Sequence, residues 1–175
     1  APDYLLVHTK VKEQFIEKLM AATQELFHEK RIAKDGFPMI VNQQHFDRLV
    51  SYMGDGDIIY GGKTERDKRY IEPTFMTNVA LEAPIMKDEI FGPILPIIEY
   101  ESTADVIEIV RSRPNPLALY LFTESKKVEE QITQSLSFGG GCINDTIYHL
   151  GTPHLPFGGV GESGMGAYHG ASSFD

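Results

Sequence analysis

Apolar strand patterns alternate with helical patterns from residue 94 onward, and this alternation constrains the fold more than any other feature of the chain. The strand candidates are residues 94–100, 117–122 and 141–144. Ser102 and Asp105 form a capping-box signature ahead of the first intervening helix, and the glycines at 139–141 are expected to end the second. Apolar strands joined by helices are typical of a βαβαβ unit. The sequence therefore predicts an α/β fold with an open parallel or mixed sheet and helices on both faces.

Two amphipathic helices are expected before residue 54. Apolar side chains recur at helical spacing over residues 11–26, after a short apolar strand at 5–7, and Thr9 is the expected N-cap. Asn42 is the expected N-cap of the second helix, which a Gly-Asp-Gly sequence at 54–56 should end. Each helix is predicted to lie on the core through one apolar face.

A hairpin is expected from residues 58–60 and 70–76, with Pro73 placing the second strand at a sheet edge or a bulge. The intervening segment 63–69 interleaves four basic residues with two acidic ones, which is typical of a solvated hairpin tip. The formal net charge of −9 argues against a general nucleic-acid binder, because neutralising phosphates requires clustered and unopposed basic side chains.

The chain has 175 residues, which is long enough for one domain with a core of its own. Its single cysteine, Cys142, excludes an internal disulfide framework and favours a reducing, cytoplasmic compartment. No apolar run approaches the roughly 20 residues that a membrane span requires, and the start of the chain shows no signal-peptide pattern. We therefore expect a soluble cytoplasmic protein.

A polar segment runs directly into an apolar strand between residues 84 and 98. Three charged residues, the last of them Glu89, precede Ile90, Phe91 and a Gly-Pro pair. Loops at strand ends often carry ligand-binding side chains. An ordinary solvated turn explains the same pattern. Spacing alone therefore leaves a binding loop and a simple turn both open.

Residues 146–175 contain seven glycines and show no sustained periodicity. Residues 159–164 match the G-x-G-x-x-G dinucleotide pattern, which works physically only between a strand and a helix. Here no clear strand precedes the glycines and no convincing helix follows, and residue 175 comes before the position, about 20 residues on, where the acidic ribose ligand is expected. We reject the fingerprint and expect these glycines to let the backbone pass close to another segment or to a substrate passage.

Cys142 is the only candidate for a thiolate nucleophile in the chain, with His149 and His154 near it in sequence. Its place in an apolar strand candidate favours a small buried hydrophobe instead. The separations between His149, His154 and His169 fit no metal-binding pattern, so no metal is expected. Ser163 lacks the strand–helix elbow of a serine hydrolase.

Three segments carry a recognisable pattern, namely A-P-D-Y at 1–4, E-I-F-G-P at 89–93 and L-P-F-G-G-V-G-E-S-G-M-G-A-Y-H-G at 155–170. Together they resemble the catalytic domain of the aldehyde dehydrogenase superfamily, and specifically its class three branch. Their order and spacing fit that family, and the resemblance covers essentially the whole chain. The last segment is highly specific, whereas the middle one alone would only be suggestive.

The resemblance implies oxidation of an aliphatic or aromatic aldehyde to a carboxylic acid with NAD or NADP, through a cysteine thiohemiacetal and a thioester. It implies that Glu89 holds the hydroxyls of the nicotinamide ribose and that Phe91 packs near the ring. Phe157 and Gly158 are implied to line the passage through which the aldehyde enters. A homodimer is expected for the full enzyme.

The resemblance also implies that the nucleophilic cysteine lies two residues before A-P-D-Y, so this chain is expected to begin just after it. The water-activating glutamate and the Rossmann cofactor domain are expected further upstream, and the C-terminal end is expected to be cut. Residues 1–175 would then be a single truncated catalytic domain that contains no catalytic residue and is inactive alone. Two alternatives remain, namely a cysteine-dependent hydrolase that uses Cys142 and a non-catalytic α/β interaction module.

Overall fold

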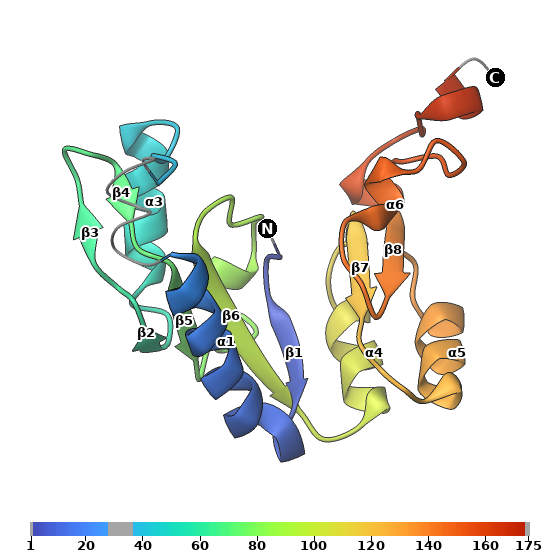
Figure 1. Cartoon of the computed structure of the whole chain (residues 1–175), viewed down its shortest axis with the longest axis horizontal. Helices are drawn as coiled ribbons and strands as arrows, with labels where there is room; N and C mark the ends of the chain where they lie inside the picture. Colours follow the sequence, from blue (N-terminus) through green and yellow to red (C-terminus); the bar gives the residue numbers. More distant parts are fainter. Residues whose placement is uncertain (1, 28–36, 174–175) are drawn as a thin grey trace. The chain divides into compact units, whose positions relative to one another are not determined.

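A computed structural model describes residues 2–27 and 37–173 of the chain (Figure 1). These residues form two compact units, residues 1–101 and residues 102–175, and each is described by itself. Within the described residues, no helix is both long enough and apolar enough to cross a bilayer.

The first unit is built on a four-stranded mixed sheet with the order β1-β6-β5-β2. β6 is the central strand, because it pairs in parallel with β1 on one side and with β5 on the other. β5 also pairs with β2 in the antiparallel direction, which makes the sheet mixed. The strands are β1 (Leu5–His8), β2 (Asp57–Tyr60), β5 (Thr74–Thr77) and β6 (Ile94–Tyr100).

Helix α1 (Lys12–Leu26) lies against this sheet (Figure 1). Its apolar residues Phe15, Ile16, Leu19 and Met20 pack on a buried cluster from the strands, as the helical spacing predicted. The predicted cap at Thr9 was wrong. Thr9 begins the short 3₁₀ turn η1 (Thr9–Val11), and the preceding histidine caps that turn by accepting a hydrogen bond from the Lys10 amide.

Helix α3 (Gln43–Tyr52) begins where the sequence predicted. The Asn42 side chain accepts a hydrogen bond from the His45 amide at 2.8 Å, which satisfies one of the amides that a helix start leaves without a partner. Phe46, Leu49 and Tyr52 form the buried face of the helix. The polar side chains of His45 and Arg48, also on this helix, contact the backbone of residues 89–91.

The predicted hairpin pairing of residues 58–60 with the following strand is confirmed, but the second strand is interrupted at Pro73. Residues before the proline form β4 (Tyr70–Ile71), which pairs with β3 (Thr64–Glu65) in a separate small hairpin. Residues after it form β5, an interior strand, so of the two predicted options the edge was wrong. The pairing of β5 with β2 does contain a register irregularity of the β-bulge kind, between Ile58 and Tyr60 of β2. Pro73 precedes β5, where its missing N–H is not needed by the sheet.

The second unit contains a parallel βαβ motif made of β7 (Ala118–Leu121), α5 (Lys126–Ser135) and β8 (Gly140–Ile143). Helix α4 (Thr103–Arg111) precedes it and packs on α5. The predicted capping box is present, with the Ser102 amide donating to Asp105 at 2.9 Å and the Asp105 amide donating back to the Ser102 hydroxyl at 3.3 Å.

The α/β class and the mixed sheet are confirmed, but the strands are distributed differently from a single βαβαβ unit. β6 has both of its edges paired within the first unit, and β7 and β8 pair with each other. The glycines at 139–141 also do not end the preceding helix. α5 stops at Ser135, and two of the glycines lie in β8, where Gly140 packs closely against the His149 ring and Gly141 against the Leu119 carbonyl.

The chain after β8 is mostly irregular. It contains helix α6 (Tyr148–Gly151) and the 3₁₀ turns η3 (Gly161–Ser163) and η4 (Gly170–Ser173). An isolated antiparallel bridge between Phe157 and Tyr168 closes a loop over the glycine-rich stretch. The local order of this stretch therefore comes from a few specific contacts rather than from regular structure.

Candidate functional site

Glu89 and Phe91 lie together on the wall of a cleft of about 420 Å³ in the first unit. The predicted cofactor-binding pair is therefore side by side on one surface. The cleft is formed by the start of the chain, the segment before α3, one residue of α3 and the loop before β6. Its lining residues are Pro2, Asp3, Phe37, Pro38, Met39, Ile40, Val41, His45, Glu89, Phe91, Gly92 and Pro93.

Phe91 has an uncommon conformation for an aromatic residue. Its φ angle is +53°, in the left-handed region, and its side chain is 70% exposed. A residue other than glycine in that region costs about 1–3 kcal/mol and persists only where the surroundings enforce it. Exposure of a large apolar ring also gives the isolated unit no burial energy. Phe91 shares this combination of a positive φ angle and an exposed apolar side chain with Ile147, whose φ angle is +66°.

Two side chains of α3 hold the backbone of this loop. Arg48 donates from Nη2 to the carbonyl oxygens of Glu89 at 3.1 Å and Ile90 at 2.9 Å. His45 Nε2 lies 2.9 Å from the carbonyl oxygen of Phe91. Arg48 Nε donates to His45 Nδ1 at 3.3 Å, so Nδ1 is an acceptor and Nε2 carries the proton that is donated to Phe91.

The loop is fixed from the other side by the start of the chain. The carboxylate of Asp3 accepts the Ile90 N–H at 2.9 Å. The Ile90 side chain is buried, with 2% of its surface exposed, and therefore anchors the loop in the core. The exposed side chains of Glu89 and Phe91 flank this anchor on either side.

The electrostatics of the cleft are set by the two carboxylates. The pKa of Glu89 is raised, first by partial desolvation of its carboxylate and second by the negative charge of Asp3. Desolvation also raises the pKa of Asp3, although the Ile90 N–H and the charge of Arg48 oppose that shift. Within the described residues, the side-chain carboxylate of Glu89 accepts no hydrogen bond, so both carboxylate oxygens can accept hydroxyl donors from a ligand.

Phe157 lies in the second unit, in a cluster of rings. Its backbone pairs with that of Tyr168 through two hydrogen bonds of 2.7 and 2.9 Å, and the two rings meet edge to face at 5.7 Å between centroids. The rings of His149 and His169 lie 5.9 and 6.0 Å from the Phe157 ring. Phe157 is half-buried, so part of its surface stays available to line a passage.

Gly158 sits where no other residue fits. A Cβ atom at this position would lie 2.1 Å from the carbonyl oxygen of Gly166. The carbonyl of Gly158 in turn lies 2.3 Å from the place of a Cβ on Gly139, the residue before β8. These close approaches explain Gly158 and Gly139 as packing requirements. They agree with the rejection of a dinucleotide fingerprint at 159–164.

Cys142 lies in β8, half-buried, with its Sγ atom 3.8 Å from Nδ1 of His149. His149 is buried, and its Nε2 atom has no hydrogen-bond partner among the described residues. A catalytic histidine is normally oriented by a third group on its second ring nitrogen. Cys142 and His149 are therefore close enough for the hydrolase alternative, but among the described residues no third group binds Nε2 of His149.

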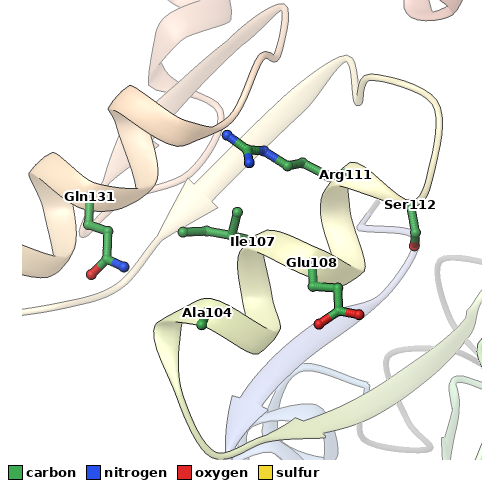
Figure 2. A pocket seen from close by; sticks show the side chains of 6 residues that line it. All are labelled: Ala104, Ile107, Glu108, Arg111, Ser112 and Gln131. Atoms are coloured by element: carbon green, nitrogen blue, oxygen red, sulfur yellow. The ribbon is translucent and has the colours of Figure 1, made fainter.

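A second hollow of about 500 Å³ lies between α4 and α5 (Figure 2). It is lined by Ala104, Ile107, Glu108, Arg111, Ser112 and Gln131, and it contains none of the predicted site residues. The guanidinium of Arg111 donates two hydrogen bonds, of 3.1 and 2.9 Å, to the carbonyl oxygen of Ser135. The cation is therefore used to join the two helices. Within the described residues, no group of three or more His, Cys, Asp or Glu could hold a metal ion.

Sequence reasoning missed Asp3, His45 and Arg48 as parts of this site. They lie 41 to 87 residues from the amides and carbonyls that they bind, and no local pattern reveals such pairs. One signal was present. His45 and Arg48 are three residues apart beside the apolar face of α3, so they project from one side of the helix near the core.

The comparisons with known proteins agree with the resemblance over the whole chain. The aldehyde dehydrogenase family model matches residues 1–175. Aldehyde dehydrogenase family 3 member H1 of Arabidopsis thaliana is 41% identical over 179 residues, which cover 100% of this chain and 37% of that protein. The dimeric NADP-preferring aldehyde dehydrogenase of Rattus norvegicus is 39% identical over 175 residues, which cover 100% of this chain and 39% of that protein.

The fold agrees equally well. The substrate-bound structure of Staphylococcus aureus AldH is 47% identical and superposes with a TM-score of 0.94, covering 100% of this chain and 39% of that one. The chain thus spans about two-fifths of the length of these relatives. The family model, the class three relatives and the solved structure lead to one conclusion: this chain belongs to the aldehyde dehydrogenase family.

Proposed function

We propose that these residues are part of an enzyme that oxidises an aliphatic or aromatic aldehyde to a carboxylic acid with NAD or NADP. The observation that carries this proposal is the cleft on which Glu89 and Phe91 stand exposed, side by side, on a backbone bonded from both sides. A carboxylate with two available oxygens fits two ribose hydroxyls. An exposed aromatic ring beside it fits the face of a flat heterocycle.

Each residue has a proposed role in the complete enzyme. Glu89 would accept hydrogen bonds from the hydroxyls of the nicotinamide ribose, and Phe91 would limit the movement of the nicotinamide ring. Phe157 and Gly158 would line the apolar passage for the aldehyde. When bound, the dinucleotide supplies hydride-accepting chemistry. The residues of this chain would bind and orient the dinucleotide and the aldehyde, and would exclude water from them. The nucleophile and the general base are proposed to come from residues outside the chain.

The complete enzyme also has a proposed assembly and location. Both units would belong to one catalytic domain that works with a separate cofactor domain. A homodimer is proposed from the resemblance, and the name of the rat relative describes that protein as dimeric. A cytoplasmic location is proposed because a single cysteine suits a reducing compartment.

The proposal is tested by assaying the complete protein and the isolated 175 residues in parallel. With hexanal or benzaldehyde and either NAD or NADP, the complete protein should form reduced cofactor in a thiol-sensitive reaction. The isolated chain should form none, because it spans about two-fifths of its relatives. No reduced cofactor from the complete protein with any aldehyde tried, or activity from the isolated chain, would contradict the proposal.

The hydrolase alternative is favoured by one observation, the 3.8 Å approach of Cys142 to His149. It predicts that Cys142 is a reactive thiolate and that Cys142→Ala abolishes activity. Our proposal predicts instead that iodoacetamide labels Cys142 slowly unless the protein is denatured. It also predicts that Cys142→Ala in the complete enzyme keeps aldehyde oxidation within about twofold of the parent, since small changes at a half-buried position away from the chemistry have small effects.

A further inference from the structure

We propose that Arg48, His45 and Asp3 form a clamp on the backbone of the Glu89–Phe91 loop and thereby position the cofactor for hydride transfer. This inference rests on the proposed function. None of the three side chains needs to touch the cofactor to do this. They act through the carbonyl and amide groups on either side of the two exposed side chains, and are therefore positioning residues.

Arg48 uses four of the five N–H donors of its guanidinium group. Nη2 binds two successive carbonyl oxygens of the loop, Nη1 donates to the Tyr52 hydroxyl at 3.2 Å, and Nε donates to His45. The guanidinium carbon also lies 5.4 Å from the centre of the Tyr52 ring. These four hydrogen bonds require N–H donors held in a fixed plane. A lysine at this position keeps the charge but cannot reproduce the arrangement.

His45 extends the clamp by one residue along the loop. Because Arg48 occupies Nδ1, the proton on Nε2 is directed at the carbonyl oxygen of Phe91. This bond falls on the residue with the left-handed φ angle of +53°. The clamp therefore acts where the loop has the strongest tendency to relax into an ordinary conformation.

Asp3 completes the clamp from the opposite side of the loop. Its carboxylate binds the Ile90 amide, so three consecutive residues of the loop have a backbone group held by a distant side chain. Asp3 also precedes β1, which pairs with β6, the strand that the loop enters. The start of the chain and the cofactor-facing loop are thus tied together both by a side chain and by the sheet.

The clamp serves orientation because core packing already accounts for the fold of the loop. The buried Ile90 side chain and the close contact between Gly92 and Leu49 fix where the loop lies. We infer that the hydrogen bonds of the clamp set the orientation of the peptide planes, and through it the direction of the Glu89 and Phe91 side chains. Reaction rates depend on such orientation, since a misplacement of about 1 Å can lower a rate by about 100-fold.

The test uses variants of the complete enzyme and two independent readouts. The variants are Arg48→Lys, His45→Ala and the conservative His45→Gln, which keeps a donor near the position of Nε2. The matched control is Arg66→Lys. Arg66 lies outside the clamp and forms an exposed ion pair with Asp47, a residue of α3, the helix that carries His45 and Arg48. The first readout is hydrogen exchange of the backbone amides over residues 87–93, where every residue except Pro93 has an exchangeable N–H. The second is the single-turnover rate of reduced-cofactor formation.

We expect faster exchange at 87–93 in Arg48→Lys and His45→Ala, together with a single-turnover rate lowered about tenfold or more. The KM for the aldehyde should stay within about twofold, because the substrate passage is not altered. His45→Gln and Arg66→Lys should resemble the parent in both readouts. A purely structural role would lower the melting temperature without changing the rate per folded molecule.

Two results would overturn the inference. Unchanged exchange at 87–93 in both loss-of-contact variants would mean that these residues do not hold the loop. Faster exchange with an unchanged single-turnover rate would mean that the held conformation does not matter for the reaction. A parent enzyme that forms no reduced cofactor would instead overturn the proposed function, and the exchange readout would still decide whether the clamp holds the loop.

Discussion

A Cβ atom on Gly92 would lie 2.5 Å from Cδ1 of Leu49, a residue of α3 whose surface is fully buried. This contact places the loop before β6 directly on the helix that carries the clamp. The backbone of Gly92 is not in the left-handed region, so the packing of Leu49, rather than backbone strain, is what excludes a side chain there. The two positions should therefore be energetically coupled.

The coupling can be measured with a double-mutant cycle in the complete enzyme. Gly92→Ala should destabilise the first unit by overpacking, by about 1–3 kcal/mol. Leu49→Ala should cost about 2–5 kcal/mol by leaving a cavity. The double variant should lose about 0.5–3 kcal/mol less than the sum, because the new methyl group occupies part of that cavity. Chemical denaturation followed by a probe in this unit measures all three. Strict additivity would contradict the contact.

Asp3→Asn should change the pH dependence of cofactor binding. Ionised Glu89 is the form that accepts two hydroxyl donors, so affinity should fall as pH decreases through the pKa of Glu89. Desolvation and the charge of Asp3 raise that pKa. Asparagine keeps an oxygen for the Ile90 amide and removes the charge, so the acidic loss of affinity should move to lower pH. Fluorescence titration with NADPH at several pH values measures this shift, and an unchanged profile would contradict it.

The same substitution makes a prediction for stability. The pKa of Asp3 is raised in the folded protein, chiefly by desolvation. A carboxyl group with a raised folded-state pKa adds stability at pH values below its unfolded pKa, and this contribution is lost as pH rises through the folded pKa. At neutral pH the charged form is therefore disfavoured by folding. Asp3→Asn should leave the melting temperature at neutral pH equal or higher, and a marked decrease would contradict the assignment.

Gly158→Ala tests the glycine-rich tail. The new methyl group would meet the Gly166 carbonyl oxygen and push apart the backbone pairing of Phe157 and Tyr168. We expect an increased KM for the aldehyde, because Phe157 would lose its position in the proposed passage. Gly151→Ala is the matched control, since nothing lies within 4 Å of a Cβ at that position. Equal effects of the two substitutions, or no effect of either, would contradict the packing explanation.

The parts of the fold that depend on local chemistry could be predicted from the sequence. β6 has the predicted bounds of Ile94–Tyr100, Asn42 caps α3, and Ser102 with Asp105 forms the capping box. Each is governed by residues within a few positions of one another. The strand break at Pro73 is also a local effect, because proline has no N–H to donate to a sheet. The interior position of β5, in contrast, depends on which strands pair across long separations in sequence.

The candidate site also combines residues that a local pattern indicates with residues that only tertiary contacts bring together. The motif at 89–93 predicted Glu89 and Phe91 as site residues, and they lie where a charged segment enters an apolar strand. Their proximity to Asp3, His45 and Arg48 comes from tertiary contacts across 41 to 87 residues, which periodicity does not encode. The positive φ angle of Phe91 was also hidden, because no sequence rule places an aromatic residue in the left-handed region.

The proposed function depends most directly on Glu89, the carboxylate proposed to bind the nicotinamide ribose. In the complete enzyme, Glu89→Gln should weaken binding of NAD(P) about tenfold or more, since hydrogen bonds to a charged group contribute about 1.5–3 kcal/mol. Single-turnover hydride transfer should slow as well, with the melting temperature and the KM for the aldehyde unchanged. Asp88→Asn, at the exposed neighbouring position, is the control and should behave like the parent. Unchanged cofactor affinity and an unchanged hydride-transfer rate in Glu89→Gln would contradict the account.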